Sequence, residues 1–259
     1  MANTPRPRRR KKKHSPLFAP LSFIVICAAV FFGLSVFFRV SPNGIEVNGA
    51  TQDITAEDII RASNIAPGDN LIFLDRIAAI SRIKIQLPYV EDAQVTRVFP
   101  NKVIITVSIG ERVAFVRLDS DIWAINKDSK VLEKIDSSQT AGLIEVVGLT
   151  PLAPKTGEVL TASPDDAPKV GYLADILDAI QTNHMQADVT RIDMSNPANP
   201  NFDYLGRFTV KMGANDNTAY KIEELLQAIS QLNASDPNAA GTFDMSALSE
   251  SGAIHFSPN

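Results

Sequence analysis

The sequence has few of the residues from which metal sites and many enzyme active sites are built. Its 259 residues include a single cysteine, Cys27, and three histidines, His14, His184 and His255. One cysteine excludes an internal disulfide and a cysteine-based zinc site, and the histidines are too far apart for metal-ligand spacing. We therefore predict no metal, no cofactor, and a fold that is stabilised by its hydrophobic core alone.

Motifs that position a nucleophile or a phosphate group are also missing. The sequence has no glycine-rich phosphate loop, no Gly-x-Ser-x-Gly and no paired-cysteine motif. The acid pairs Asp165–Asp166 and Glu223–Glu224 are interpreted as solvated residues at helix starts, because a general-acid pair needs a desolvated cleft. We predict no catalytic residue and no small-molecule substrate. The alternative, a membrane-anchored enzyme, would require a convergent polar cluster.

Acidic residues are absent from the first 39 positions, where eight cations gather, while the rest of the chain is acidic. An uncharged run of 22 residues, Leu17 to Phe38, follows most of these cations and is long enough for a helix that crosses a bilayer once. Six consecutive cations precede the run: Arg8, Arg9, Arg10, Lys11, Lys12 and Lys13. By the positive-inside rule we predict a type II protein of the cytoplasmic (inner) membrane, with residues 1–16 cytoplasmic and the C-terminal domains extracytoplasmic.

Three other interpretations of the N-terminal region are weaker. A cleaved signal peptide would have a shorter apolar core and a small-residue cleavage site, whereas this run ends in Val36-Phe37-Phe38-Arg39. A buried soluble helix would have a polar face, and Ser22 and Ser35 do not provide one. A nucleic-acid-binding patch is a less economical explanation of the basic block than a topology signal beside anionic lipid.

Residues 40–112 have the pattern of a small α+β domain. A short alternating segment, Gly44 to Gly49, predicts a strand, and Thr55 with Asp58 forms a capping-box pattern at the start of a helix. A second helix is expected from Asp75 to Gln86, ended by Pro88. Strands at 93–99 and 102–109 follow, and Val103, Ile105, Val107 and Ile109 share one face of the latter strand. The order strand, helix, helix, strand, strand predicts helices on one face of a three-stranded sheet.

Residues 113–246 alternate several strands with two helices. Ser163-Pro164 predicts a serine-capped helix start with proline in the first turn, and a second helix is expected from Asn217 to Leu232. The remainder, 247–259, is expected to form a C-terminal strand and tail. We therefore predict an α+β fold in which a β-α-α-β-β domain is followed by a mixed, β-rich domain.

Several short segments, in this order and spacing after a membrane anchor, resemble the FtsQ/DivIB family of bacterial cell-division proteins. They are Ile45 to Gly49, Gly68 to Phe73, Leu87 to Val90, Val95 to Asn101, Arg191 to Met194, Phe208 to Gly213, Lys221 to Leu232 and Gly241 to Met245. The resemblance covers nearly all of residues 17–256. It implies a polypeptide-transport-associated (POTRA) domain at 40–112 and a β-domain at 113–246.

The resemblance implies a non-enzymatic scaffold at the division septum, which binds FtsL-type and FtsB/DivIC-type membrane proteins and supports septal cell-wall synthesis. The implied mechanism is addition of a partner strand to an open sheet edge near the C-terminus. The residues that it points to are Thr242, Phe243, Met245, Ile254 and Phe256. Core packing is an equally open role for Phe243, Met245 and Ile254. The alternative function is a transport or assembly chaperone that holds extended polypeptides with its POTRA-like domain.

Overall fold

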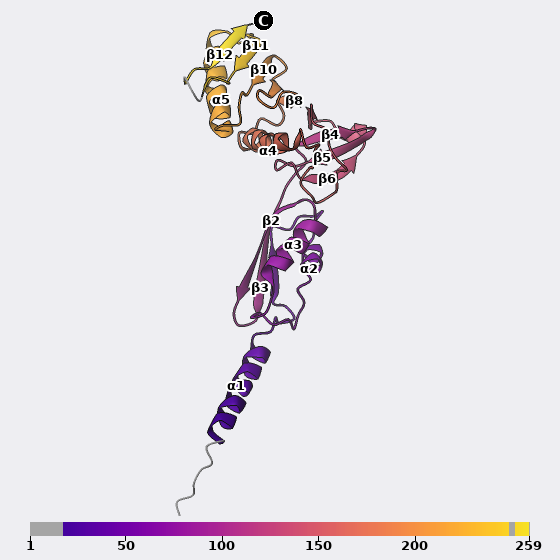
Figure 1. Cartoon of the computed structure of the whole chain (residues 1–259), viewed down its shortest axis with the longest axis vertical. Coiled ribbons are helices and arrows are strands. Elements are labelled where there is room, and N and C mark those ends of the chain that lie inside the picture. Colours follow the sequence, from indigo (N-terminus) through magenta and orange to yellow (C-terminus); the bar gives the residue numbers. More distant parts are fainter. Residues whose placement is uncertain (1–17, 249–251, 259) are drawn as a thin grey trace, which may run out of the picture.

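The computed structural model describes residues 18–248 and 252–258, and it gives the side chains of the first helix over 23–33 and from Phe37 onward. The molecule is elongated, with helix α1 (Phe18–Phe37) at one end, a small domain in the middle and a larger domain at the other end (Figure 1). Among the described residues, no helix combines the length and the apolar character needed to cross a membrane. The predicted topology signal, Arg8 to Lys13, lies outside the described residues.

The middle domain has the predicted element order and forms a three-stranded sheet with strand order β1-β3-β2. Strand β1 is parallel to β3, and β2 is antiparallel to it. Its elements are β1 (Ile45–Asn48), α2 (Ala56–Ser63), α3 (Arg76–Gln86), β2 (Val90–Val98) and β3 (Lys102–Ile109). The capping box is confirmed: the Asp58 amide donates to the Thr55 hydroxyl at 3.3 Å, and the Thr55 amide donates to the Asp58 carboxylate at 3.2 Å.

The larger domain is built on a nine-stranded sheet with strand order β12-β11-β10-β9-β8-β7-β4-β5-β6. Its strands are β4 (Ala114–Leu118), β5 (Asp121–Ile125), β6 (Val131–Ile135), β7 (Ile144–Val147), β8 (Val189–Asp193), β9 (Asn201–Tyr204), β10 (Phe208–Lys211), β11 (Gly241–Asp244) and β12 (His255–Pro258). A short 3₁₀ helix, η1 (Ser137–Gln139), precedes β7.

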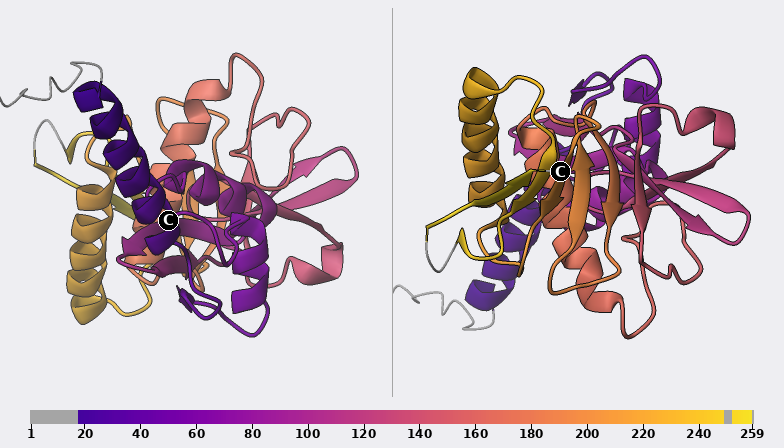
Figure 2. Two further views of the ribbon diagram at one scale, coloured as in Figure 1. Left: turned by 90° about the horizontal axis from the view of Figure 1, so that it is seen from below. Right: turned by 90° about the horizontal axis from the view of Figure 1, so that it is seen from above.

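Helices α4 (Ala167–Thr182) and α5 (Thr218–Ser235) are the crossovers of two βαβ units in the larger domain. Helix α4 connects the parallel pair β7 and β8, and α5 connects the parallel pair β10 and β11. The two helices touch and share one core with the sheet, which holds Leu173, Ile176, Ile222 and Leu225 among its fully buried side chains. Figure 2 shows both helices from the two ends of the molecule.

The start of α4 differs from the prediction. The helix begins at Ala167 with Asp166 as its N-cap residue, and proline at position 168 lies in its first turn, so Ser163 is not the cap. Asp166 is also buried instead of solvated, because its carboxylate accepts the Thr150 amide at 2.9 Å and pairs with Lys169 at 2.6 Å. The side chain is thus held by the loop before the helix, a partner 16 residues away that no local pattern identifies.

Candidate functional site: the C-terminal edge of the sheet

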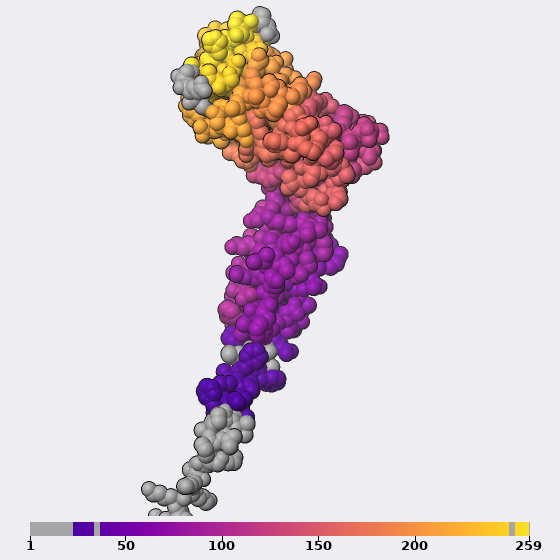
Figure 3. Space-filling view, viewed as in Figure 1, coloured from indigo at the N-terminus to yellow at the C-terminus, as the bar shows by residue number. Residues whose placement is uncertain are grey.

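Strand β12 forms one edge of the nine-stranded sheet, at the end of the molecule opposite α1. It pairs antiparallel with β11, with Thr242 opposite Ser257 and Phe243 opposite Phe256. Among the described residues β11 is its only strand neighbour. The space-filling view shows this C-terminal segment, in yellow, on the surface of the far end of the molecule (Figure 3). The outer side of β12 is therefore a sheet edge accessible to another chain.

The hydrogen bonds of β11 identify which backbone groups of β12 point outward. The Gly241 and Met245 amides donate to carbonyls of the β10 side, those of Arg207 and Lys211. Because the direction of backbone groups alternates along a strand, Thr242 and Asp244 face β12. Their partners Ser257 and His255 face β11 in turn. The N–H and C=O groups of Phe256 thus point away from the sheet, as do those of Ile254 on the same alternation.

Proline 258 limits this free edge at its C-terminal end. A proline has no N–H, so its outward side offers only a carbonyl to an added strand. The usable edge is therefore short and centred on Phe256. A short edge that ends in proline is a common way to prevent uncontrolled strand pairing.

Gly241 allows β12 to approach β11 closely. A Cβ atom at this position would overlap the Ser257 carbonyl oxygen and would lie 2.9 Å from the Cα of the residue after it and 3.0 Å from the Phe256 ring. A larger residue would therefore displace β12. The partner-binding residues predicted from sequence do not include Gly241. The need for glycine at this position arises from β12, a strand that begins 14 residues further along the chain.

Three phenylalanine rings fix β12 to the sheet from one side. The Phe243 ring lies 4.7 Å from that of Phe256 and 5.2 Å from that of Phe208, measured between centroids. The Arg207 guanidinium lies 4.5 Å above the Phe208 ring and donates to the carbonyls of Pro237 and Ala239 in the loop that leads into β11. Such ring pairs and cation–π contacts add to the stability that burial provides.

The five residues predicted to bind a partner lie together at this edge, but with different exposure. Phe243 and Met245 are buried in the core, at 2% and 0% exposed. Thr242, Ile254 and Phe256 are half-buried, and the latter two pack against the core from its margin. A partner would therefore reach the backbone and side chains of β12, while Phe243 and Met245 support β12 from beneath.

The opposite edge of the sheet, β6, is partly covered by the chain itself. The amide of Val131 donates to the Glu158 carbonyl, and the Gly157 amide donates to the Val131 carbonyl, at 2.9 and 2.8 Å. An isolated antiparallel β-bridge between Lys130 and Val159 extends the covered part of this edge. The start of β6 is thus closed, so β12 is the more accessible of the two sheet edges.

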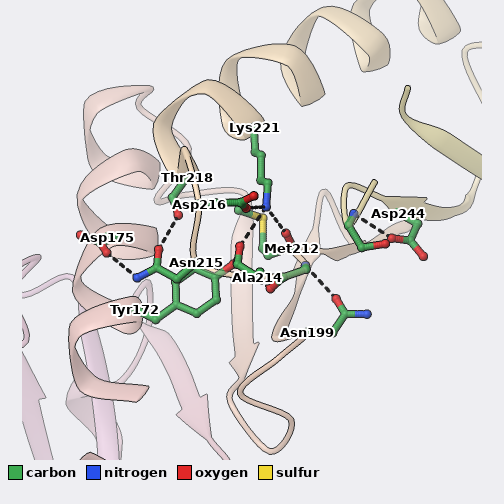
Figure 4. Close-up of polar contacts among 12 residues, drawn as sticks. Tyr172, Asp175, Asn199, Met212, Ala214, Asn215, Asp216, Thr218, Lys221 and Asp244 are labelled. Atoms are coloured by element: carbon green, nitrogen blue, oxygen red, sulfur yellow. Dashed lines mark hydrogen bonds and ion pairs between the residues drawn. The ribbon is translucent and has the colours of Figure 1, made fainter. Parts of the chain in front are cut away.

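A buried lysine holds the loop between β10 and α5. Lys221 is fully buried, and its Nζ donates to the carbonyls of Met212 and Ala214, at 3.0 and 2.9 Å, and to the Asp216 carboxylate (Figure 4). The Tyr172 hydroxyl of α4 donates to the Ala214 carbonyl at 3.1 Å. Burial and nearby Asp216 raise the pKa of this tyrosine, which stays protonated. This cluster was not predicted from sequence.

The C-terminal edge presents backbone groups and half-buried apolar side chains. Within the described part of the chain, no group of three histidine, cysteine, aspartate or glutamate side chains could hold a metal ion. The Asp244 carboxylate, on the residue opposite His255, caps a turn: it accepts the Ser246 amide at 2.9 Å, and this hydrogen bonding lowers the pKa of Asp244. An open backbone edge beside half-buried apolar side chains provides the geometry for β-strand addition.

Comparison with known proteins gives matches in both domains. Residues 40–108 match the family model described as "POTRA domain, FtsQ-type". The chain is 27% identical to the cell division protein DivIB of Clostridium botulinum (strain Hall) over 222 residues, which cover 85% of this chain and 84% of that protein. It is 27% identical to the cell division protein FtsQ of Syntrophotalea carbinolica over 214 residues, 81% of this chain and 73% of that protein. The predicted resemblance is confirmed: the chain is a relative of the DivIB and FtsQ proteins over most of its length.

Proposed function

We propose that this relative of the DivIB and FtsQ proteins is a non-enzymatic scaffold of the bacterial division machinery. Its proposed partners are FtsL-type and FtsB/DivIC-type membrane proteins, and its place is the division septum. Its relatives are named as cell division proteins, which supports the cellular role. The observation that carries the binding role is the open edge of β12, where the backbone of Phe256 has no strand partner among the described residues.

The proposed topology is a single membrane crossing by the uncharged segment of residues 17–38, which extends beyond the described residues, with the N-terminus in the cytoplasm. The uncharged sequence of residues 17–38 and the cations before it support this topology. The anchor would hold the POTRA domain next to the membrane and leave β12 at the distal end of the molecule (Figure 1). Partners with extracytoplasmic segments would meet that end away from the lipid.

The proposed mechanism is strand addition to β12. An extended partner segment would exchange hydrogen bonds with the outward N–H and C=O groups of Phe256, and its alternate side chains would contact Ile254 and the sheet margin. The short edge, ended by proline 258, accepts only a short segment. Selectivity would then come from the side chains of that segment.

The test is truncation after Leu248, which removes β12 and keeps the buried Phe243 and Met245 in place. Purified full-length protein and the truncated protein are compared in binding to the purified extracytoplasmic segments of the FtsL-type and FtsB/DivIC-type proteins. We expect a loss of affinity of at least about tenfold, since an interface centred on strand addition is lost with the strand. Unchanged affinity of a folded truncated protein would exclude β12 as the site.

A substitution at the other sheet edge serves as the matched control. Lys134→Gln changes an exposed residue of β6 whose ion pair with Asp121 lies on the surface. It is expected to leave partner affinity and stability unchanged, because exposed ion pairs contribute little. Equal losses in both variants would indicate a general effect on the sheet.

The alternative, a polypeptide-holding chaperone, has support from the POTRA domain. Strand β2, nine residues long, is an edge strand that pairs only with β3 in the described part of the chain. An extended client could add to it. A fluorescent fusion separates the two functions: a division scaffold concentrates at midcell, whereas a general chaperone distributes along the membrane.

A further inference from the structure

The base of the POTRA domain, where α1 meets it, carries apolar side chains on its surface. Phe73 is 63% exposed and Phe99 55% exposed, and Ile72 and Val98 beside them are each more than a third exposed. These four residues are called the apolar base here. Ile72 and Phe73 lie in the loop before α3, Val98 is the last residue of β2, and Phe99 follows it in the turn between β2 and β3. Exposed apolar clusters of this kind mark surfaces that contact a partner or a lipid phase.

The connection between α1 and the apolar base is fixed. The Leu71 amide donates to the Phe38 carbonyl at 2.8 Å, and the Val40 amide donates to the Asp69 carbonyl at 2.9 Å. The Ser41 amide donates to the Asn101 carbonyl at 3.0 Å, which joins the second loop to the same segment. Residues 38–41 are thus paired along both loops, and the apolar base cannot move far from the end of α1.

Two contacts between aromatic rings place the apolar base beside the C-terminal end of α1. The Phe38 ring lies 5.2 Å from that of Phe99, edge to face, and the Phe31 ring lies 6.1 Å from that of Phe73. Phe31 precedes the end of α1 at Phe37 by six residues, a distance of about 9 Å along a helix axis. Phe73 therefore reaches past the end of the helix, to the level of its last turns.

We infer that the apolar base inserts into the outer interface of the same bilayer that α1 crosses, so that its occupant is lipid. The inference rests on the proposed membrane anchor. The exposed apolar surface of α1 around Phe31 continues into Phe73 without a break, and exposed Arg39 follows directly at the headgroup level. Aromatic residues at this level of a membrane protein anchor it at the interface. The POTRA domain would thereby be held in one orientation on the membrane.

The test places one tryptophan in the apolar base and measures quenching by lipid. Native Trp123 is replaced first by Trp123→Phe, which breaks no hydrogen bond, since its indole nitrogen has none in the described structure. Phe73→Trp or Phe99→Trp is then added to the full-length chain, in nanodiscs that hold one copy each. The discs contain phosphatidylcholine brominated near the headgroup end of its acyl chains. We expect a fall in emission of about twofold or more, compared with unbrominated discs, because both positions would lie at the interface.

The matched control is Ile85→Trp in the same background. Ile85 is 65% exposed and belongs to the same domain, but it lies in the last turn of α3, beside Val159 and Gly157 of the larger domain. Its emission should be unaffected by brominated lipid. Quenching at position 85 equal to that at 73 and 99 would overturn the inference.

Two further outcomes separate this inference from the proposed function. A chain that integrates into the discs without quenching at 73 or 99 overturns the lipid contact and leaves the anchor intact. A chain that an alkaline wash removes from liposomes overturns the anchor, and the lipid contact with it. Partner binding at β12 is measured separately and depends on neither result.

Discussion

At the residue scale, two buried ionic side chains, Lys221 and Asp166, hold loops of the larger domain in place. Lys221 gathers two carbonyls and a carboxylate around its ammonium group, and Asp166 joins the start of α4 to the loop before it. A buried charge of this kind is tolerated only when its hydrogen bonds are satisfied. Both residues therefore fix loops whose backbone would otherwise be free.

Replacement of Lys221 is expected to destabilise the β-domain strongly. Lys221→Met keeps the aliphatic chain but leaves the Met212 and Ala214 carbonyls without their ammonium donor. We expect a loss of about 3 kcal/mol in the free energy of unfolding, measured by urea denaturation. The control Lys211→Met, at an exposed position of β10, should change it by less than about 0.5 kcal/mol. Equal effects of the two variants would contradict the role of the buried cluster.

Asp166 gives a pH dependence with a definite sign. Hydrogen bonds from Lys169 and Thr150 lower the pKa of Asp166 to about 2, below the value of about 3.9 for an unfolded aspartate. Its contribution to stability is thus complete above about pH 5 and is lost as the pH falls from about 4 to 2. Unfolding of Asp166→Asn and of the native protein should therefore differ at neutral pH and converge near pH 2. Exposed Asp165→Asn should show no such convergence.

At the element scale, β12 depends on a contact with a glycine. Gly241 has no side chain where the Ser257 carbonyl passes, and the Phe243 and Phe256 rings meet next to it. The strand itself is short and lies at an edge, where pairing on one side alone gives modest stability. The pairing of β12 with β11 is therefore sensitive to substitution of Gly241.

Gly241→Val is expected to release β12 and weaken partner binding without unfolding the domain. The new side chain would overlap the backbone of β12, whereas β12 contributes no fully buried residue to the larger core and only Phe256 at its margin. Hydrogen exchange of the His255 and Ser257 amides should accelerate, because both face β11 in the native pairing. Gly171→Ala is the control, since nothing lies within 4 Å of a Cβ at that helical position. Slow exchange at both amides in the valine variant would contradict the contact.

At the scale of the whole molecule, a polar junction connects the middle domain to the larger domain. The Nζ of Lys130 donates to the carbonyls of Lys84 and Val90, both at 3.1 Å, and the Tyr89 hydroxyl donates to Glu133 at 2.6 Å. Desolvation by burial lowers the pKa of Lys130, because the junction disfavours the charged form of this side chain. These contacts set the distance between the α1 end of the molecule and the β12 edge.

Lys130→Ala is expected to loosen the angle between the domains. It removes two hydrogen bonds across the junction, for a loss of about 1–3 kcal/mol in docking free energy. Spin labels at the exposed Glu57 and Asp165 positions, in a Cys27→Ser background, should show a broader distance distribution. Lys127→Ala, in the same turn, removes a hydrogen-bonded ion pair with Asp178 inside the larger domain and no hydrogen bond across the junction, so it should leave the distribution much less changed. A narrow distribution in both variants would show that other contacts orient the domains.

Many of the helices and strands could be predicted from the sequence, because the signals for them are local. The capping box of Thr55 and Asp58, the buried face of Val103, Ile105 and Val107, and the uncharged run before residue 39 each depend on neighbours a few positions away. The C-terminal location of the candidate site is a prediction that comes from the resemblance. The helical spacing of Thr218, Lys221 and Leu225 did place the lysine on the buried stripe of α5, a signal that its charge obscured.

Only the tertiary structure decided which strand lies at the open edge and which candidates face the core. Phe243 and Phe256 have similar sequence surroundings, yet one is fully buried and the other half-exposed, because β11 has strands on both sides and β12 has one. The same holds for Gly241, which contacts β12, and for Asp166, which accepts the Thr150 amide from the loop before α4. Sequence by itself determined the elements and their order, since those depend on local periodicity and caps. Which strand lies at a sheet edge, which side chains are buried and how the two domains join all depend on pairing between distant segments. No local pattern carries that information.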